Sequence, residues 1–127
     1  MLPKTKTILS WTLRILFGIL FLLAGLPKLL GDAGTLARFG DWGYPARFAH
    51  VVGLMEISGA LALFIPRFAR YGALLIGIVM IGAFITHIFA QEWSRLAWVG
   101  TIAVAQIAIW KLLEPQEGST EPISKSR

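Results

Sequence analysis

The sequence predicts an all-α membrane protein, an antiparallel bundle of four transmembrane helices with both termini in the cytoplasm. Hydrophobic residues make up 56% of the 127 residues and charged residues only 15%, whereas soluble domains carry about 25% charged residues. A chain of this size leaves much of its surface exposed, so lipid is the expected solvent. The hydrophobic residues gather in four runs, each near the roughly 20 residues that cross a bilayer, at 8–26, 48–65, 71–90 and 96–113.

These runs are expected to be helices, because backbone polar groups in lipid must be satisfied within the segment. The first run follows Lys4 and Lys6, as a signal peptide would. Its apolar stretch exceeds the roughly 7–15 residues of a signal peptide, and no convincing cleavage site follows. We therefore interpret it as an uncleaved first span.

The connections differ in length and character. The turn at 66–70 is very short, which makes the second and third spans antiparallel neighbours, whereas the loop at 27–47 is long and rich in aromatic residues, as interfacial segments are. Lysine and arginine are more numerous on the side of the termini, which predicts a multi-pass membrane protein with cytoplasmic termini. We expect a membrane domain over 1–113 and a polar, disordered tail over 114–127.

Composition excludes several kinds of function. The chain has no cysteine, which rules out thiolate catalysis and cysteine-ligated metals within it. Its net charge of +5 is interpreted as membrane anchoring, with the lipid bilayer as partner. No basic patch interleaved with aromatic residues suggests nucleic-acid binding.

Polar residues and glycines share one face of the first span. Intervals of four, three, four and three residues separate its members, so they line up along one side of a helix. The glycines let another backbone approach closely, which predicts that this face contacts other helices. The row consists of Arg14, Gly18, Phe21, Gly25 and Lys28.

Similar rows occur on the other spans, at Gly53, Glu56 and Ala60, then at Ala73, Gly77, Met80, Phe84 and His87, then at Val99, Ala103, Gln106 and Trp110. Glu56 is the most informative member, because it lies about midway along its span. A charged side chain there costs at least about 2.5–3.5 kcal/mol. We therefore expect Glu56 to be paired, protonated or in contact with water inside the bundle, with Arg14, Lys28, Gln106 and His87 as candidate partners.

Three segments of the chain carry a recognisable pattern, namely the row from Arg14 to Lys28, the stretch "GYPARFAHVVGLMEISGALALFIPR" and "GAFITH". Together they resemble the DoxX-like family of small bacterial membrane proteins, and the likeness covers about residues 10–110. Positions that resemble the family pattern are Arg14, Gly18, Gly25, Lys28, Gly43, Pro45, Gly53, Glu56, Gly59 and His87. The resemblance implies a four-helix membrane bundle associated with redox complexes, since the family is named after a subunit of a thiosulfate:quinone oxidoreductase.

Two functions of different class remain open. One is an accessory subunit of a membrane quinone-linked oxidoreductase that binds a quinone-like lipophilic carrier, with a partner redox protein supplying electrons. Glu56 and His87 are then the best candidates for catalytic residues, and the ligand-binding residues would be Arg14, Lys28, Glu56, His87 and Gln106. The alternative is a non-enzymatic module that stabilises a partner membrane protein or forms a homo-oligomer, with the aromatic loop as docking surface.

Structural interpretations compete with these roles. Glu56 is equally well explained as an anchor bonded to Arg14 or Gln106. For His87 a bond to Thr86 or a loop carbonyl is the favoured interpretation, and for Arg14 and Lys28 it is interfacial anchoring. Trp42 is assigned to the interfacial aromatic belt. No metal site is predicted, because haem ligation by His50 and His87 lacks an attachment motif and zinc lacks further ligands.

Overall fold

The structure is a computed structural model that describes residues 3–113, and the predicted tail at 114–127 lies outside the described residues. Five helices follow one another in this part of the chain. They are α1 (Pro3–Leu30), α2 (Ala33–Asp41), α3 (Ala46–Phe64), α4 (Ala69–Phe89) and α5 (Trp93–Leu112). All but α2 are long and apolar enough to cross a membrane. The predicted all-helical class with four spans is confirmed, whereas the side on which the termini lie stays a prediction.

The segment predicted as one loop, 27–47, contains regular structure. Helix α1 continues through Pro27 and ends before Gly31, whose φ of +75° suits the residue without a Cβ. Asp32 then caps α2, because its carboxylate accepts the Thr35 N–H at 3.0 Å. Proline removes only one backbone donor, so a short extension of the helix survives it, and the chain turns where glycine permits.

Close glycine contacts set the packing of neighbouring helices. A Cβ on Gly53 would lie 2.5 Å from the Leu29 backbone nitrogen and 2.8 Å from the Gly25 carbonyl oxygen, so α1 and α3 meet there. A Cβ on Gly72 would lie 2.6 Å from the Gly59 carbonyl oxygen, where α3 meets α4. The backbones of two helices approach this closely only where both helices carry residues with very small side chains.

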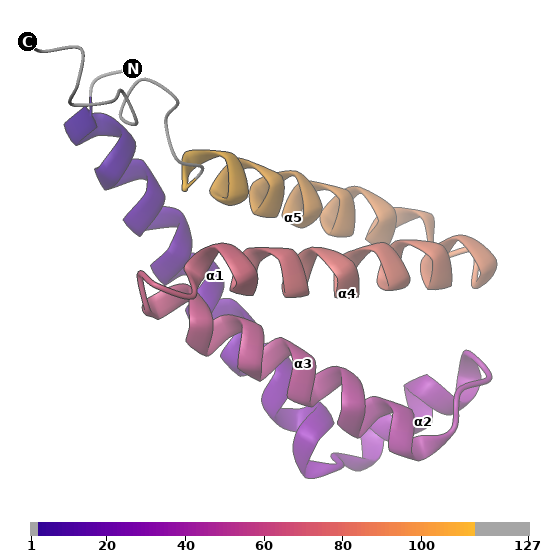
Figure 1. Cartoon of the computed structure of the whole chain (residues 1–127). Coiled ribbons are helices and arrows are strands. Elements are labelled where there is room, and N and C mark those ends of the chain that lie inside the picture. The colour runs from indigo at the N-terminus through magenta and orange to yellow at the C-terminus, as the bar shows by residue number, and fades with distance from the viewer. Residues whose placement is uncertain (1–2, 114–127) are drawn as a thin grey trace, which may run out of the picture.

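The four spans form two pairs that diverge. Helix α1 packs along α3, and α4 packs along α5, while α1 and α5 touch only lightly. In Figure 1 the pair α1–α3 separates from the pair α4–α5 toward the end that carries α2. We call this end the α2 end. The core between the pairs includes Phe21, Leu63 and Ile76, and it leaves room for a cavity at the α2 end.

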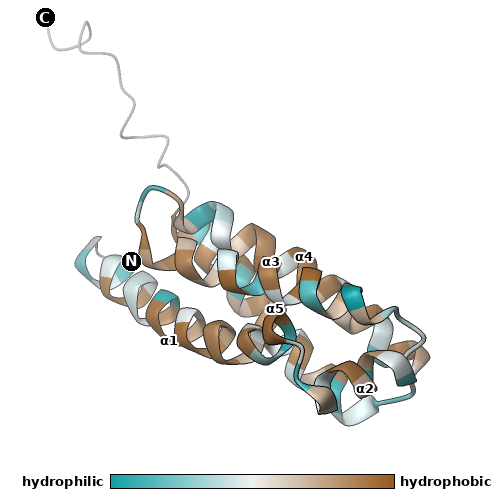
Figure 2. Cartoon of the chain, turned by 90° about the horizontal axis from the view of Figure 1, so that it is seen from below, coloured by the Kyte–Doolittle hydropathy of each residue, from teal (hydrophilic) through white to brown (hydrophobic). Residues whose placement is uncertain are grey.

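The predicted inward faces are buried or half-buried with one exception. The first row is buried apart from the half-buried Lys28, and Glu56 is only 2% exposed. Phe84, predicted to face inward on α4, is instead 39% exposed and does not line the space between the helix pairs, so its side chain faces away from the core. Figure 2 shows hydrophobic residues along the long helices and hydrophilic ones toward the helix ends and α2, as expected for a bundle surrounded by lipid.

Candidate functional site

A cavity of about 830 Å³ lies between the two helix pairs at the α2 end. All five helices contribute to its wall. The wall is mostly apolar, with aromatic and branched side chains such as Phe21, Trp98 and Ile102. Small-molecule sites combine this size and apolar lining with a few polar groups. The ionisable residues of the wall are Lys28, Asp32, Arg38, Glu56, His87 and Arg95.

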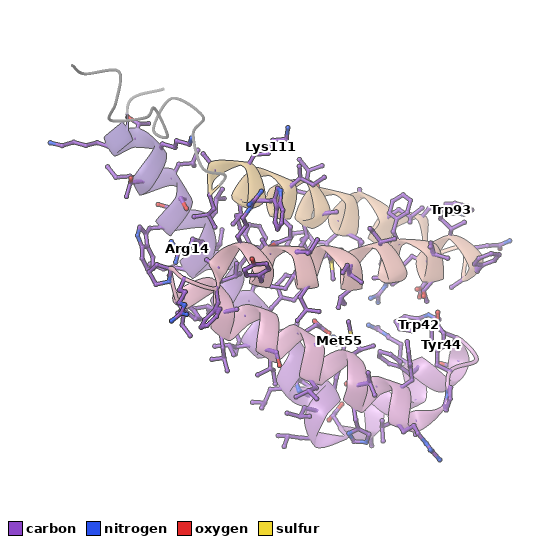
Figure 3. The ribbon with its side chains drawn as sticks, in the orientation of Figure 1. Arg14, Trp42, Tyr44, Met55, Trp93 and Lys111 are labelled. Atoms are coloured by element: carbon purple, nitrogen blue, oxygen red, sulfur yellow. The ribbon has the colours of Figure 1, made fainter. Side chains whose placement is uncertain are left out.

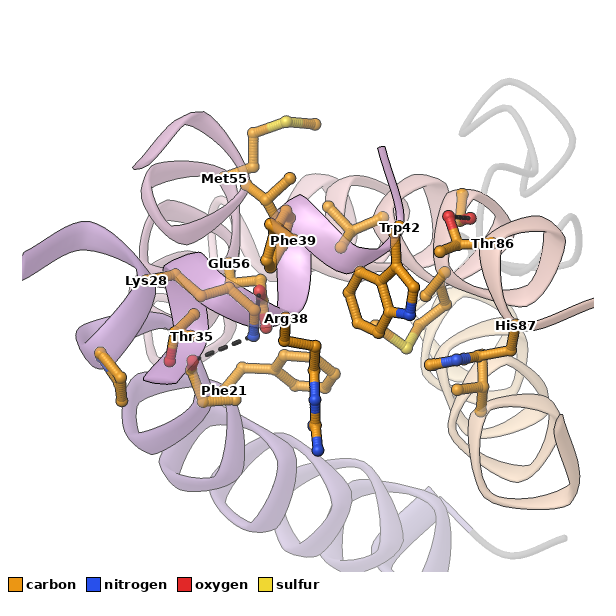
Figure 4. Close-up of a pocket in the computed structure, with 18 of the residues that line it drawn as sticks. Phe21, Lys28, Thr35, Arg38, Phe39, Trp42, Met55, Glu56, Thr86 and His87 are labelled. Atoms are coloured by element: carbon orange, nitrogen blue, oxygen red, sulfur yellow. Dashed lines mark hydrogen bonds and ion pairs between the residues drawn. The ribbon is translucent and has the colours of Figure 1, made fainter. Parts of the chain in front are cut away.

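Lys28 and Glu56 form an ion pair in the wall made by α1 and α3. The Lys28 ammonium lies 2.9 Å from Glu56 Oε1, and it also donates to the Ala24 carbonyl oxygen at 3.1 Å. Lys28 thus turns back along α1 into the membrane, as long helical side chains do, and not outward as an anchor would. Figure 4 shows the pair on one side of the cavity. Pairing removes most of the cost of a carboxylate at this depth.

Residues that follow α2 bridge the mouth of the cavity to the opposite helix pair. The Tyr44 hydroxyl lies 2.7 Å from Thr86 Oγ1 on α4. The Thr86 hydroxyl donates its own hydrogen to the Gly82 carbonyl oxygen at 2.9 Å. The Tyr44 hydroxyl is therefore the donor in its hydrogen bond with Thr86. The Trp42 ring meets the His87 ring edge-on, with centroids 5.4 Å apart. Figure 3 shows Trp42 and Tyr44 together at the α2 end.

His87 stands on the opposite wall from the ion pair and is held by Glu92. Its Nδ1 lies 2.7 Å from Glu92 Oε1, in the short turn between α4 and α5. The favoured sequence interpretation, a bond to Thr86 or a loop carbonyl, is therefore wrong. The ring is 7% exposed, lines the cavity and points toward Trp42 in Figure 4. His87 and the Lys28–Glu56 pair thus face the same space from two sides.

The Glu92 carboxylate lies outside the spans, and several hydrogen-bond donors surround it. The hydrogen bond from His87 is the main reason why the pKa of Glu92 lies below its usual range, and the positive charge of Arg95 and the nearby Trp42 indole act in the same direction. Arg95 Nε lies 3.8 Å from Glu92 Oε2. Glu92 is therefore an ionised acceptor that ties the α2 segment to α4 and α5.

Arg14 lies away from the cavity. It is 14 residues from Lys28, or about 21 Å along α1, and Figure 3 places it near the turn between α3 and α4. Its Nε donates to the Leu63 carbonyl oxygen at 2.8 Å, and its guanidinium stacks on Trp11 at 3.8 Å. Leu63 is in the last turn of α3, where a cation stabilises the unpaired carbonyls. We therefore assign to Arg14 a role in packing α1 against α3.

Gln106 and His50 also lie outside the cavity lining. Gln106 is buried, and neither its amide nitrogen nor its oxygen has a hydrogen-bond partner among residues 3–113. His50 Nδ1 lies 2.9 Å from the Leu29 carbonyl oxygen, where it joins α3 to α1. Within the described residues, no group of three or more histidine or acidic side chains is placed to hold a metal ion.

Sequence reasoning missed Glu92 and underestimated Trp42. Trp42 was assigned to the aromatic belt, yet it packs on His87 and lies near Glu92. A signal for Glu92 was available, since it follows His87 by five residues across a turn in which Gln91 has a positive φ of 59°. For Trp42 no local signal existed, because its contacts depend on how the chain folds back after α2.

Comparisons with known proteins agree with this architecture. The sequence model described as the DoxX-like family matches residues 12–110. "Putative oxidoreductase CatD" of Bacillus subtilis (strain 168) is 36% identical over 83 residues, which are 65% of this chain and 62% of that protein. The match thus spans less than two thirds of that relative.

"Inner membrane protein YqjF" of Escherichia coli (strain K12) is 33% identical over 94 residues, which are 72% of each chain. No solved structure matches significantly. With four helices able to cross a membrane, the chain is a multi-pass protein of the inner membrane.

Proposed function

Because this chain belongs to the DoxX-like family of membrane proteins, we propose that it binds a quinone-like lipophilic carrier in the cavity at the α2 end. It would act as the membrane subunit of a redox system whose partner protein exchanges electrons with the carrier. The observation that carries the proposal is a cavity of about 830 Å³ with an apolar wall and an ion pair in it. A relative's name, which contains the word oxidoreductase, points the same way.

The shape of the cavity suits a ligand that arrives through the lipid. Helices α1 and α5 touch only lightly, and lining residues on both sides of the gap are exposed, namely Leu23 on α1 and Trp98 on α5. These side chains face the acyl chains in a membrane. An apolar carrier can therefore enter sideways between α1 and α5 without crossing water.

The ion pair offers what a quinone ring needs. A quinone has carbonyl oxygens that accept hydrogen bonds and that take up protons when the ring is reduced. One N–H of Lys28 donates to the Ala24 carbonyl oxygen, and the ammonium pairs with Glu56 at 2.9 Å. An ammonium has three N–H groups, so a further one can donate to a carbonyl oxygen of the ring. We assign to Glu56, beside this ammonium, the exchange of a proton with the bound carrier.

The alternative, a docking module, finds less support in the aromatic loop. Phe39 is buried, and the rings of Phe39, Trp42, Tyr44 and Phe48 pack against one another at centroid distances of 4.7–6.2 Å. Aromatic side chains engaged within the fold leave less area for a partner. A partner redox protein and a homo-oligomer both stay predictions.

The test is to purify the protein gently and measure copurifying quinone by mass spectrometry in variants that narrow the cavity. Gly82 lines the cavity, and a Cβ there meets no atom within 4 Å, so Gly82→Phe places a ring in the cavity without a backbone clash. Gly100 has the same free space but does not line the cavity, which makes Gly100→Phe the matched control.

We expect wild type and Gly100→Phe to retain quinone, and Gly82→Phe to lose most of it. Glu56→Gln preserves the volume of the side chain and should weaken retention by removing the charge that holds Lys28. An absence of quinone from the wild-type protein, or equal amounts in Gly82→Phe, would count against the proposal.

A further inference from the structure

His87 presents one unused ring nitrogen to the cavity. Its Nδ1 is engaged by Glu92 at 2.7 Å, and its Nε2 has no hydrogen-bond partner among the described residues 3–113. The ring is buried yet lines the cavity, and Figure 4 shows it pointing inward from α4. Nε2 is therefore the polar atom that this wall offers to a ligand.

Glu92 decides which hydrogen-bonding role Nε2 has. An ionised carboxylate can only accept, so the His87 proton must lie on Nδ1. The lowered pKa of Glu92 keeps the carboxylate ionised. In a neutral imidazole the other nitrogen is then an acceptor. Nε2 thus offers a lone pair to the cavity and no hydrogen.

Glu92 is itself fixed from several sides, which makes this orientation rigid. The Trp42 side chain lies near it in the segment after α2, and Arg95 Nε on α5 lies 3.8 Å from Glu92 Oε2. The Trp42 ring also meets the His87 ring edge-on at 5.4 Å. The imidazole is held in one tautomer and one position by neighbours that the ligand does not have to displace.

We propose that His87, positioned by Glu92, selects the reduced form of the carrier, because it accepts a hydrogen bond from a ring hydroxyl. This inference rests on the proposed function and specifies the ligand further. A quinol has a hydroxyl hydrogen to give to Nε2, whereas a quinone has only acceptor oxygens and would meet a second acceptor there. The quinone oxygen and His87 Nε2 would both be acceptors in an apolar site. Each would lose its hydrogen bond to water without gaining another, which disfavours binding of the quinone.

The opposite wall does not discriminate in this way. Lys28 donates and Glu56 accepts, so this pair can serve either a carbonyl or a hydroxyl oxygen. The preference for the reduced form therefore depends on the His87 wall. His87 is a binding residue in this scheme, and Glu92 is a positioning residue that acts through it.

The test measures the affinity of both forms of one probe. Full-length protein in lipid nanodiscs is titrated calorimetrically under anaerobic conditions with decylubiquinol and with decylubiquinone. The titrations are run at about pH 8, at which a histidine side chain in water is neutral. One hydrogen bond gained in place of an acceptor clash corresponds to about tenfold. We expect the wild-type protein to bind the quinol about tenfold more tightly than the quinone.

Three variants separate positioning from packing. His87→Phe keeps a ring beside Trp42 but removes Nε2, and the ratio of affinities should fall to near one. Glu92→Gln keeps His87 but no longer fixes its tautomer, so the ratio should fall to about threefold or less. Gly100 lies outside the cavity lining and does not touch His87, so Gly100→Phe should keep the wild-type ratio. Glu92 lies outside the spans, so its variant provides the test if His87→Phe does not fold.

The outcomes distinguish this inference from the function on which it rests. Equal affinity of both forms for the wild-type protein overturns the inference and leaves carrier binding intact. An unchanged preference in both His87→Phe and Glu92→Gln does the same. If neither form binds to the wild-type protein, the proposed function fails and the inference fails with it.

Discussion

Replacing Lys28 by methionine tests the ion pair at the centre of the cavity wall. The Glu56 side chain is 3% exposed and the Lys28 side chain 22% exposed. Removing one partner of a buried pair costs about 3–5 kcal/mol, because the remaining charge is left uncompensated. Lys28 is partly accessible, which lowers the expected loss for Lys28→Met to about 2–3 kcal/mol. This agrees with the roughly 2.5–3.5 kcal/mol penalty for a lone charge at the centre of a span.

The double variant separates pairing from the cost of each substitution. Glu56→Met alone leaves an ammonium that can turn toward the cavity mouth, so it should cost about 1–2 kcal/mol. Lys28→Met combined with Glu56→Met removes both charges together, and apolar replacement of a whole buried pair is often neutral. We therefore expect the double variant within about 1 kcal/mol of wild type. The losses of the single variants sum to about 3–5 kcal/mol, so the resulting coupling energy would be about 2–6 kcal/mol.

The assay is equilibrium unfolding of the purified protein by SDS in mixed micelles, followed by far-ultraviolet circular dichroism. The same transition is measured for wild type, both single variants and the double variant. If the losses of the single variants simply add in the double variant, to within about 0.5 kcal/mol, Lys28 and Glu56 are energetically independent. The interpretation of Lys28 and Glu56 as a stabilising ion pair in the cavity wall would then be refuted.

Three further predictions concern packing and pH. Gly53→Ala forces a Cβ against the backbone of α1 and should destabilise by about 1–3 kcal/mol in the same assay, whereas Gly100→Ala, with open space around it, should be neutral or slightly stabilising. Arg14→Met should cost about 1–3 kcal/mol through the lost bond to the Leu63 carbonyl, with Arg14→Lys between it and wild type; equal stability of all three would contradict the packing role. Because hydrogen bonding lowers the pKa of Glu92 in the fold, its contribution is present above the unfolded pKa of about 4.3 and is lost as the pH falls through the lower folded pKa. Thermal melting below about pH 4.5 should therefore depend on pH less steeply in Glu92→Gln than in wild type, and identical profiles would show that Glu92 is not engaged.

Several features of the site followed from the sequence because they depend on one helix at a time. The spacing from Arg14 to Lys28 predicted a face that the structure buries up to Gly25. The depth of Glu56 required an inward orientation, and the residue is buried. Phe84 shows the limit of this reasoning, since it shares the row of His87 and yet is exposed and does not line the cavity.

The identity of the partners could not be read from the same pattern. Arg14, Lys28, Gln106 and His87 were all candidate partners of Glu56, and only Lys28 lies within ion-pair distance. The choice depends on how far α1 slides along α3, which the contact of Gly25 with Gly53 sets. Glu92 entered the site for the same kind of reason, through a turn whose geometry no periodicity describes.

That four apolar helices cross the membrane, and which side of most of them is buried, could be predicted from the amino-acid sequence alone. This is possible because a backbone in lipid must satisfy its hydrogen bonds within its own segment, and because a charged side chain that faces lipid costs free energy. The tertiary structure decided that the helix pairs separate at the α2 end, that Lys28 meets Glu56, and that Trp42 and Glu92 hold His87. Those outcomes depend on distances between helices, which are set by close contacts of a few small residues far apart in the chain.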